Sequence, residues 1–207
     1  MNDVTDQIET GVRERILTTA ERLFREIGYQ KTTVADIARE LRMSPANVYR
    51  FFDSKKSINA GVAKRLMGEV EQAARETASG KTASGKTTSE KTPATERLRQ
   101  LLTTIHRMNS DRYVADAKMH DMVAIAMEED WDVCRMHMET IIGTIGTVIA
   151  DGVASGEFRV ADVNVAANCT CAAMVRFFHP QLIADCADKP EPTLDQMIDF
   201  AIAALKG

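Results

Sequence analysis

Residues 80–87, with the sequence GKTASGKT, have the spacing of a phosphate-binding loop. Gly80, Gly85, Lys86 and Thr87 stand at the positions that this motif requires. In such a loop the backbone amides surround the phosphates, while the lysine and the hydroxyl group reach the terminal phosphates and Mg²⁺. The motif therefore raises the hypothesis of a nucleotide-binding enzyme.

The loop needs a buried β-strand before it and a helix directly after it, because these elements aim the amides at the phosphate. The preceding residues, GEVEQAARETAS, instead have the composition of a polar helix end, and Pro93 precedes the next apolar pattern. Residues 77–93 contain a tandem TASGKT and almost no apolar side chains, which is typical of a flexible linker. We therefore predict a linker here, and the nucleotide-binding enzyme that would use Gly80 to Thr87 stays as an alternative.

A second group of residues with chemical potential lies between Thr32 and Phe52, where two short amphipathic helices are joined by a tight turn. Ser44 is a natural N-cap for the second helix, and Pro45 fits its first position, where the missing N–H costs nothing. Two short helices joined in this way are the plan of a helix-turn-helix, whose second helix enters the major groove of DNA.

The side chains after this cap suit contacts with DNA. Asn47 can bond adenine through two atoms, the small Ala46 can touch a thymine methyl group, and Arg50 can reach guanine or phosphate. Lys55 begins the following helix, whose positive N-terminal end favours a phosphate. This segment therefore predicts DNA binding.

The amino-acid sequence of this region resembles that of a known protein family. Residues Arg13 to Ile58 resemble the N-terminal domain of the TetR family of bacterial transcriptional regulators. The matching positions are Ile16, Leu17, Ala20, Leu23, Phe24, Gly28, Tyr29, Thr32, Thr33, Val34, Ile37, Ala38, Ser44, Val48, Tyr49, Phe52, Ser54 and Lys55. One position departs from the family: the turn residue that is often Gly is Arg42 here. A positive φ would strain an arginine, and a phosphate contact would offset that strain.

The resemblance implies a homodimer whose helix-turn-helix units bind a palindromic operator. It implies that a small-molecule effector enters the C-terminal domain, changes the spacing of the two DNA heads and weakens binding, so that the protein acts as a repressor. By this resemblance Thr33, Ser44 and Tyr49 contact phosphates and Lys55 contacts the DNA backbone, although Thr33 and Tyr49 could also serve capping and packing. The predicted DNA-binding residues are Thr33, Arg42, Ser44, Pro45, Ala46, Asn47, Tyr49, Arg50 and Lys55.

Apolar spacing of three and four residues recurs along the chain, so we expect an all-α fold. An N-terminal three-helix helix-turn-helix DNA-binding domain should precede a larger C-terminal helical domain for ligand binding and dimerisation. The expected boundaries are residues 1–54 for the DNA-binding domain, 55–76 for a connecting helix, 77–93 for the low-complexity linker and 94–207 for the effector-binding and dimerisation domain.

The charge distribution fits a basic DNA-binding segment joined to an acidic C-terminal part. Residues 31–56 hold six basic and three acidic side chains, whereas residues 93–207 hold 10 basic and 17 acidic ones. The first ten residues lack an apolar run, and the apolar stretch at 141–154 is too short to span a bilayer. The four cysteines form no CxxC pair, so we expect a cytoplasmic protein without a membrane partner.

The effector pocket and the dimer interface are predicted from apolar side chains in the C-terminal part. A flexible lining for irregular ligands is offered by Met119, Met122, Met127, Trp131, Met136 and Met138, although a plain Met-rich core is the simpler interpretation. In the family the last two helices form the interface. The residues that they offer here include Ala166, Cys169, Ala173, Phe177, Met197, Ile198, Ala201 and Ile202.

Two further chemistries find little support. Cys134 and His137 would share a helix face, but a zinc site needs three or four converging ligands, so we predict no metal and keep a metal-sensing regulator as an alternative. No nucleophile with an adjacent base and no paired acid–base groups stand out, so we predict no catalytic residues, no enzyme activity and no cofactor.

Overall fold

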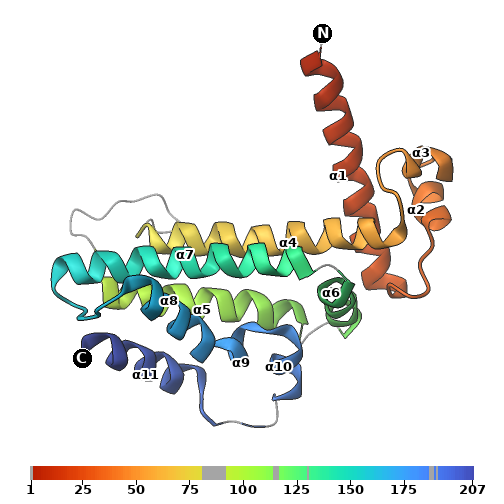
Figure 1. Cartoon of the computed structure of the whole chain (residues 1–207). Helices are drawn as coiled ribbons and strands as arrows, with labels where there is room; N and C mark the ends of the chain where they lie inside the picture. The colour runs from red at the N-terminus through yellow and green to blue at the C-terminus, as the bar shows by residue number, and fades with distance from the viewer. Residues whose placement is uncertain (1, 81–91, 114–116, 130, 187–188, 190) are drawn as a thin grey trace. The chain divides into compact units, whose positions relative to one another are not determined.

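The computed structural model of the protein describes residues 2–80, 92–113, 117–129, 131–186, 189 and 191–207 (Figure 1). Within these ranges every regular element is a helix and no strand occurs, which confirms the predicted all-α fold. None of the described helices combines the length and apolar character needed to cross a membrane. The helices are α1 (Asn2–Ile27), α2 (Val34–Glu40), α3 (Pro45–Tyr49), α4 (Lys55–Ala78), α5 (Ala94–Tyr113), α6 (Ala117–Glu129), α7 (Trp131–Ser155), α8 (Val163–Ala173), α9 (Val175–Phe178), α10 (Pro180–Asp185) and α11 (Leu194–Lys206).

The chain forms two compact units. The head unit consists of Met1–Leu66 and Asp116–Val133, and the body unit consists of Met67–Ala115 and Cys134–Gly207. This division differs from the expected boundaries, which assigned residues 94–207 to a single C-terminal domain. Helix α6 lies within that range but belongs to the head unit.

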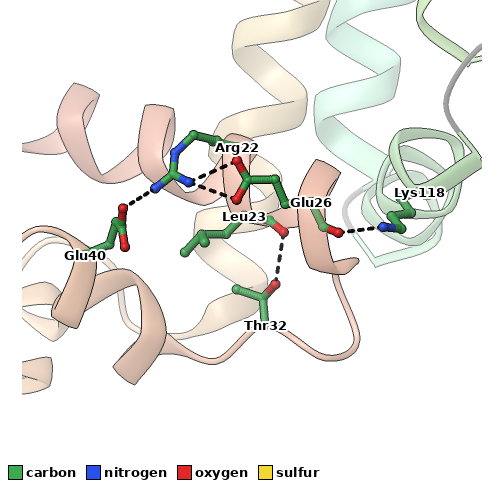
Figure 2. Close-up of polar contacts among 6 residues, drawn as sticks. All are labelled: Arg22, Leu23, Glu26, Thr32, Glu40 and Lys118. Carbon is green, nitrogen blue, oxygen red and sulfur yellow. Dashed lines mark hydrogen bonds and ion pairs between the residues drawn. The ribbon is translucent and has the colours of Figure 1, made fainter.

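Two hydrogen bonds explain why α6 groups with the head unit. The Nζ atom of Lys118 donates to the carbonyl oxygen of Glu26 at the end of α1, over 2.6 Å (Figure 2). The side-chain amide of Asn59, which is fully buried in α4, donates to the carbonyl oxygen of Met122 over 3.1 Å. Both bonds join residues far apart in the sequence, so helical periodicity alone could not reveal them.

The head unit is built on a core of apolar side chains from all of its longer helices. Phe24 is completely buried and its ring meets Tyr29 edge-on, with 5.2 Å between the ring centroids. Helix α1 ends at Gly28, whose φ of +97° belongs to the left-handed region that glycine adopts without strain. The chain turns there, and the Thr32 hydroxyl donates to the Gly28 carbonyl oxygen over 2.8 Å.

The body unit has a core of its own. The long apolar faces of α5 and α7 contribute fully buried side chains, and α8 and α11 add more. The fully buried members of this core include Leu98, Leu101, Leu102, Ile145, Val148, Ile149, Met174 and Ile198. Burying a side chain of this size stabilises a fold by about 1.5–3 kcal/mol relative to leaving it exposed, so this core is the main source of stability in the body unit.

Polar groups fix the ends of helices in the body unit. Arg97 is buried, and its guanidinium donates to the carbonyl oxygen of Ala78 and to the carboxylate of Asp151, each over 2.7 Å. The carboxylate of Glu157 accepts the first amides of α5, from Ala94 over 2.8 Å and from Thr95 over 2.9 Å. Burial alone would raise the pKa of Glu157, but these hydrogen bonds outweigh it and lower the pKa to about 2.

The segment from 163 to 178 contains two helices. Helix α8 ends at Ala173, Met174 caps it with a φ of −87° and a ψ of 0°, and α9 follows for one turn. The His179–Pro180 step then begins α10, with Pro180 at its first position. Proline is compatible with a first turn but not with a helix interior, which explains the break at residue 180.

Candidate nucleic-acid interface

The turn between α2 and α3 holds Arg42 in a left-handed backbone conformation. Arg42 has a φ of +55°, and the turn is closed by the Met43 amide, which donates to the Ala38 carbonyl oxygen over 2.9 Å. Arg42 thus has a left-handed conformation at the turn position where the family often has glycine. A residue with a Cβ atom loses about 1–2 kcal/mol in this conformation.

We predict that Arg42→Gly raises the free energy of unfolding by about 1 kcal/mol, because glycine removes the strain but loses more chain entropy on folding. Urea denaturation followed by circular dichroism measures this change. If Arg42 also contacts a phosphate, the same variant binds DNA more weakly and its affinity depends less steeply on salt.

Arg42→Ala is the matched control, since it removes the charge but retains the Cβ atom. It should lose the same DNA affinity without any gain in stability. Equal stability of the two variants would show that the backbone at residue 42 stores no strain.

Helix α3 is placed by its cap and by a single buried anchor. The Ser44 hydroxyl accepts the Asn47 amide over 3.2 Å, and Pro45 occupies the first helical position. Val48 is fully buried and holds the helix on the head unit, while Tyr49 is 50% exposed. Ala46 and Arg50 are also exposed. Asn47 is half-buried. The other predicted DNA-contacting side chains of α3 are therefore exposed, and the start of this helix is already capped by Ser44.

Thr33 serves as the N-cap of α2. Its hydroxyl oxygen accepts the Asp36 amide over 3.1 Å, and its own backbone amide donates to the Asp36 carboxylate over 2.9 Å. These two bonds form a capping box, and the Thr33 hydroxyl also donates to the carboxylate over 2.6 Å. The bonds from the Thr33 hydroxyl and amide lower the pKa of Asp36. Thr33 is exposed, so a phosphate contact would be made by a residue that already caps a helix.

Lys55 has a structural role in the head unit. Its Nζ atom donates to the carbonyl oxygens of Tyr29, Gln30 and Thr32 over 2.9, 3.4 and 3.1 Å, and lies 4.3 Å from the centre of the Tyr29 ring. An ammonium group has three protons, and these three carbonyl oxygens can accept all of them. A direct bond from Lys55 to phosphate would require one of these contacts to be exchanged.

Charged residues of α1 contact the helix-turn-helix, which no local pattern in the sequence indicates. Arg13 donates to the Phe51 carbonyl oxygen over 2.5 Å, and its guanidinium lies 4.4 Å from the centre of the Phe52 ring. Arg22 bridges Glu26 of its own helix and Glu40 at the end of α2, over 2.9 and 2.6 Å (Figure 2). From spacing alone these residues belong to a solvated helix face, because their partners are distant in the sequence.

The structure describes four of the predicted effector-pocket side chains, and these belong to two different units. Met119 and Met122 are buried in the head unit, whereas Met136 and Met138 are exposed on α7 in the body unit. The side chains of Met127 and Trp131 lie outside those that the structure describes. This part of the effector prediction therefore gains no geometric support.

The predicted dimer-interface residues fall into two groups. Phe177, Ile198, Ala201 and Ile202 are buried within the protomer, while Cys169 is exposed and Ala166, Ala173 and Met197 are half-buried. The large exposed apolar side chains of the same two helices are others: Val165 of α8 is 58% exposed and Phe200 of α11 is 66% exposed. The helices named from the sequence do present apolar surface, but α11 does so on the opposite face.

The alternative chemistries gain no support from the described residues. Gly80 follows the end of helix α4 and not a strand, and residues 81–87 of the phosphate-loop motif lie outside the described part of the chain. His137 is paired with Glu71 through Nδ1 over 2.8 Å. No group of three potential metal ligands occurs among the described side chains.

Comparison with known proteins agrees with this architecture. The family model described as "Bacterial regulatory proteins, tetR family" matches residues 16–66, and that described as "Tetracyclin repressor-like, C-terminal domain" matches residues 94–197. The biofilm operon icaADBC HTH-type negative transcriptional regulator IcaR of Staphylococcus aureus (strain Newman) is 45% identical over 47 residues, which are 23% of this chain and 25% of that protein. The match thus spans about a quarter of this curated relative.

Solved structures resemble the whole chain. SmeT, described as the repressor of the Stenotrophomonas maltophilia multidrug efflux pump SmeDEF, is 20% identical with a TM-score of 0.63, over 93% of this chain and 89% of that one. A complex of SmeT with triclosan gives the same TM-score at 17% identity, over 94% and 91%. The fatty acid degradation regulator FadR of Bacillus halodurans is 16% identical with a TM-score of 0.62, over 94% of both chains. At these identities the likeness shows a shared fold.

Proposed function

We propose, since this chain belongs to the TetR family of bacterial transcriptional regulators, that it is a repressor which binds a palindromic operator as a homodimer and is released by a small-molecule effector. Members of this family are DNA-binding transcription factors and not enzymes. The observation that carries the proposal is the surface of α3, where Ala46 near the start of the helix and Tyr49 and Arg50 at its end are all exposed. A regulator of this kind acts in the cytoplasm, where bacterial DNA lies.

In this proposal α3 enters the major groove and reads base edges with Ala46, Asn47 and Arg50. Tyr49 bonds phosphate, and the exposed charge of Arg42 at the turn lies on the same helix-turn-helix. Lys55 contributes by fixing the loop before α2, because its ammonium group is bonded to three carbonyl oxygens of that loop. Phosphate contacts set the register, and base contacts supply the sequence preference.

The homodimer is supported by exposed apolar side chains on α8 and α11. Val165, Cys169 and Ala172 are spaced by four and three residues and are all exposed, so they share one face of α8. Phe200 is exposed on α11. Large exposed apolar side chains are costly on a monomer and are typical of association surfaces, and two helices from each subunit can form a four-helix bundle.

The effector is proposed from the family and from a relative of the same fold. One solved structure of the same fold is a complex of SmeT with triclosan. An effector can release DNA only if it binds the DNA-free state more tightly than the DNA-bound state. The effector of this chain therefore has to favour a dimer in which the two α3 helices do not match the operator.

A gel-shift assay with the DNA upstream of its own gene tests the proposal. We expect a shift that resists unrelated competitor DNA and weakens steeply with salt, because phosphate contacts release counterions. Sedimentation of the protein at micromolar concentration should show a dimer. A monomer, or a shift that unrelated DNA abolishes equally well, would contradict the proposed operator-binding dimer.

A further inference from the structure

The body unit contains a pocket of about 350 Å³ that the predicted effector residues do not line. Its walls come from α5, α9, α10 and the start of α11, and α10 packs against both α5 and α9. Figure 1 shows α9 and α10 leading from the end of α8 beside α5. The volume lies within the range of small-molecule sites, which begins at about 300 Å³.

The pocket combines apolar walls with an excess of positive charge. Phe177, Leu182 and Ile183 supply apolar surface, and the basic side chains are His106, Arg176 and Lys189. No aspartate or glutamate lines the pocket among the described residues. A cavity with apolar walls and several basic side chains suits a ligand that has an apolar body and a negative end.

Of these basic groups, the Arg176 guanidinium always carries its positive charge. It donates to the carbonyl oxygen of Glu191 over 2.7 Å and to that of Lys189, and it lies 5.5 Å from the centre of the Phe177 ring. Carbonyl oxygens fix its position without neutralising its charge. The described side chains offer it no carboxylate, and two of its five N–H groups are engaged in these two bonds.

A hydrogen bond to the backbone fixes the orientation of the His106 ring. Its Nδ1 atom lies 2.9 Å from the carbonyl oxygen of Phe177, so Nδ1 carries the proton because a carbonyl oxygen only accepts. Its ring also meets the Phe177 ring edge-on, with 5.7 Å between centroids. Nε2 is thereby left for another partner, and in the imidazolium form it donates to an anion.

We propose that this pocket binds a small amphipathic organic anion, a carboxylate with a short apolar body. Arg176 holds the carboxylate by a charge-assisted hydrogen bond, and Phe177, Leu182 and Ile183 cover the apolar body. Its use as the effector site rests on the proposed function, because only a regulator would convert this binding into release of DNA.

Octanoate is the probe, and the full-length protein without DNA is the sample. Saturating octanoate should raise the melting temperature by about 5 °C or more, and calorimetry should show a single saturable site. The neutral analogue octanol should bind at least about tenfold more weakly, because it offers no charge to Arg176.

Two variants and a matched control locate the site. Arg176→Gln should weaken octanoate binding by about 10- to 100-fold, and Ser110→Trp should weaken it by filling the pocket without changing its charge. Arg107→Gln removes the same charge from the exposed side of α5 and should bind octanoate like the wild type. Circular dichroism confirms that each variant is folded before binding is measured.

Three outcomes would overturn the site: no saturable binding of octanoate, equal binding of octanol, or equal loss in Arg107→Gln and Arg176→Gln. Because DNA is absent, these outcomes do not bear on operator binding. A protein that binds octanoate as expected but gives no specific gel shift would instead contradict the proposed regulator function.

Discussion

Replacement of Tyr49 by alanine is expected to weaken operator binding by about 10- to 100-fold without lowering the melting temperature. Tyr49 is 50% exposed at the end of α3, so its removal costs little apolar burial in the protomer. A hydrogen bond to a charged phosphate contributes about 1.5–3 kcal/mol, and each 1.4 kcal/mol is a factor of ten in affinity.

Fluorescence anisotropy with a labelled operator at two salt concentrations measures the loss. Tyr49→Phe separates the two parts of the side chain, since it keeps the ring and removes only the hydroxyl group. Ile27→Ala is the matched control in the head unit, because Ile27 is 41% exposed and lies outside the helix-turn-helix. Wild-type affinity in Tyr49→Ala would show that Tyr49 does not contact the operator. Equal losses of affinity in Tyr49→Ala and Ile27→Ala would indicate a general effect on the head unit.

The elements of the head unit were predictable because their signals are local. Ser44 and Pro45 mark the start of α3 within two residues, and Gly28 marks the end of α1. Caps and turns depend on backbone conformation, which a short stretch of side chains largely decides. The position in the turn raised the question of a positive φ at Arg42, which the residue type opposes, and the observed φ is +55°.

The partners of each buried face were not predictable. Apolar spacing shows that a helix buries one side, but it does not show against which other helix. Helix α6 has such a face, and its bonds to Glu26 and from Asn59 place it in the head unit. The carbonyl partners of Lys55 were not predictable for the same reason, because they lie more than twenty residues away in the sequence, and its contact with DNA stays a prediction.

The exposed apolar face of α11, which we propose as part of the dimer interface, could have been found from one residue. The periodic apolar positions of this helix include Ile198 and Ile202, and these pack into the core of the protomer. Phe200 lies between them and interrupts the pattern, since residues two positions apart do not share a face of a helix. An aromatic side chain off the buried face is therefore the better indicator of an association surface than the periodic positions.

Two glycines of the same helix give opposite predictions for one substitution. A Cβ atom at Gly152 of α7 would lie 2.1 Å from Cδ2 and 2.5 Å from Cε2 of the Phe158 ring. Phe158 is only 2% exposed, and its amide donates to the Gly152 carbonyl oxygen over 3.0 Å. The backbone bond and the buried side chain both keep the ring close to α7. At Gly143 a Cβ atom would meet nothing within 4 Å.

Gly152→Ala should therefore lower the free energy of unfolding by about 2–4 kcal/mol, because the ring of Phe158 has to leave its packed position. Gly143→Ala should raise it by about 0.5–1 kcal/mol through helix propensity alone. Both substitutions add the same methyl group to the same helix, so propensity cancels between them and the difference measures the space that Phe158 occupies. Urea denaturation of the two variants gives this difference directly. Equal changes in the two variants would show that the chain after α7 can move away from Gly152, and that its close approach there is not what fixes Phe158 in the core of the body unit.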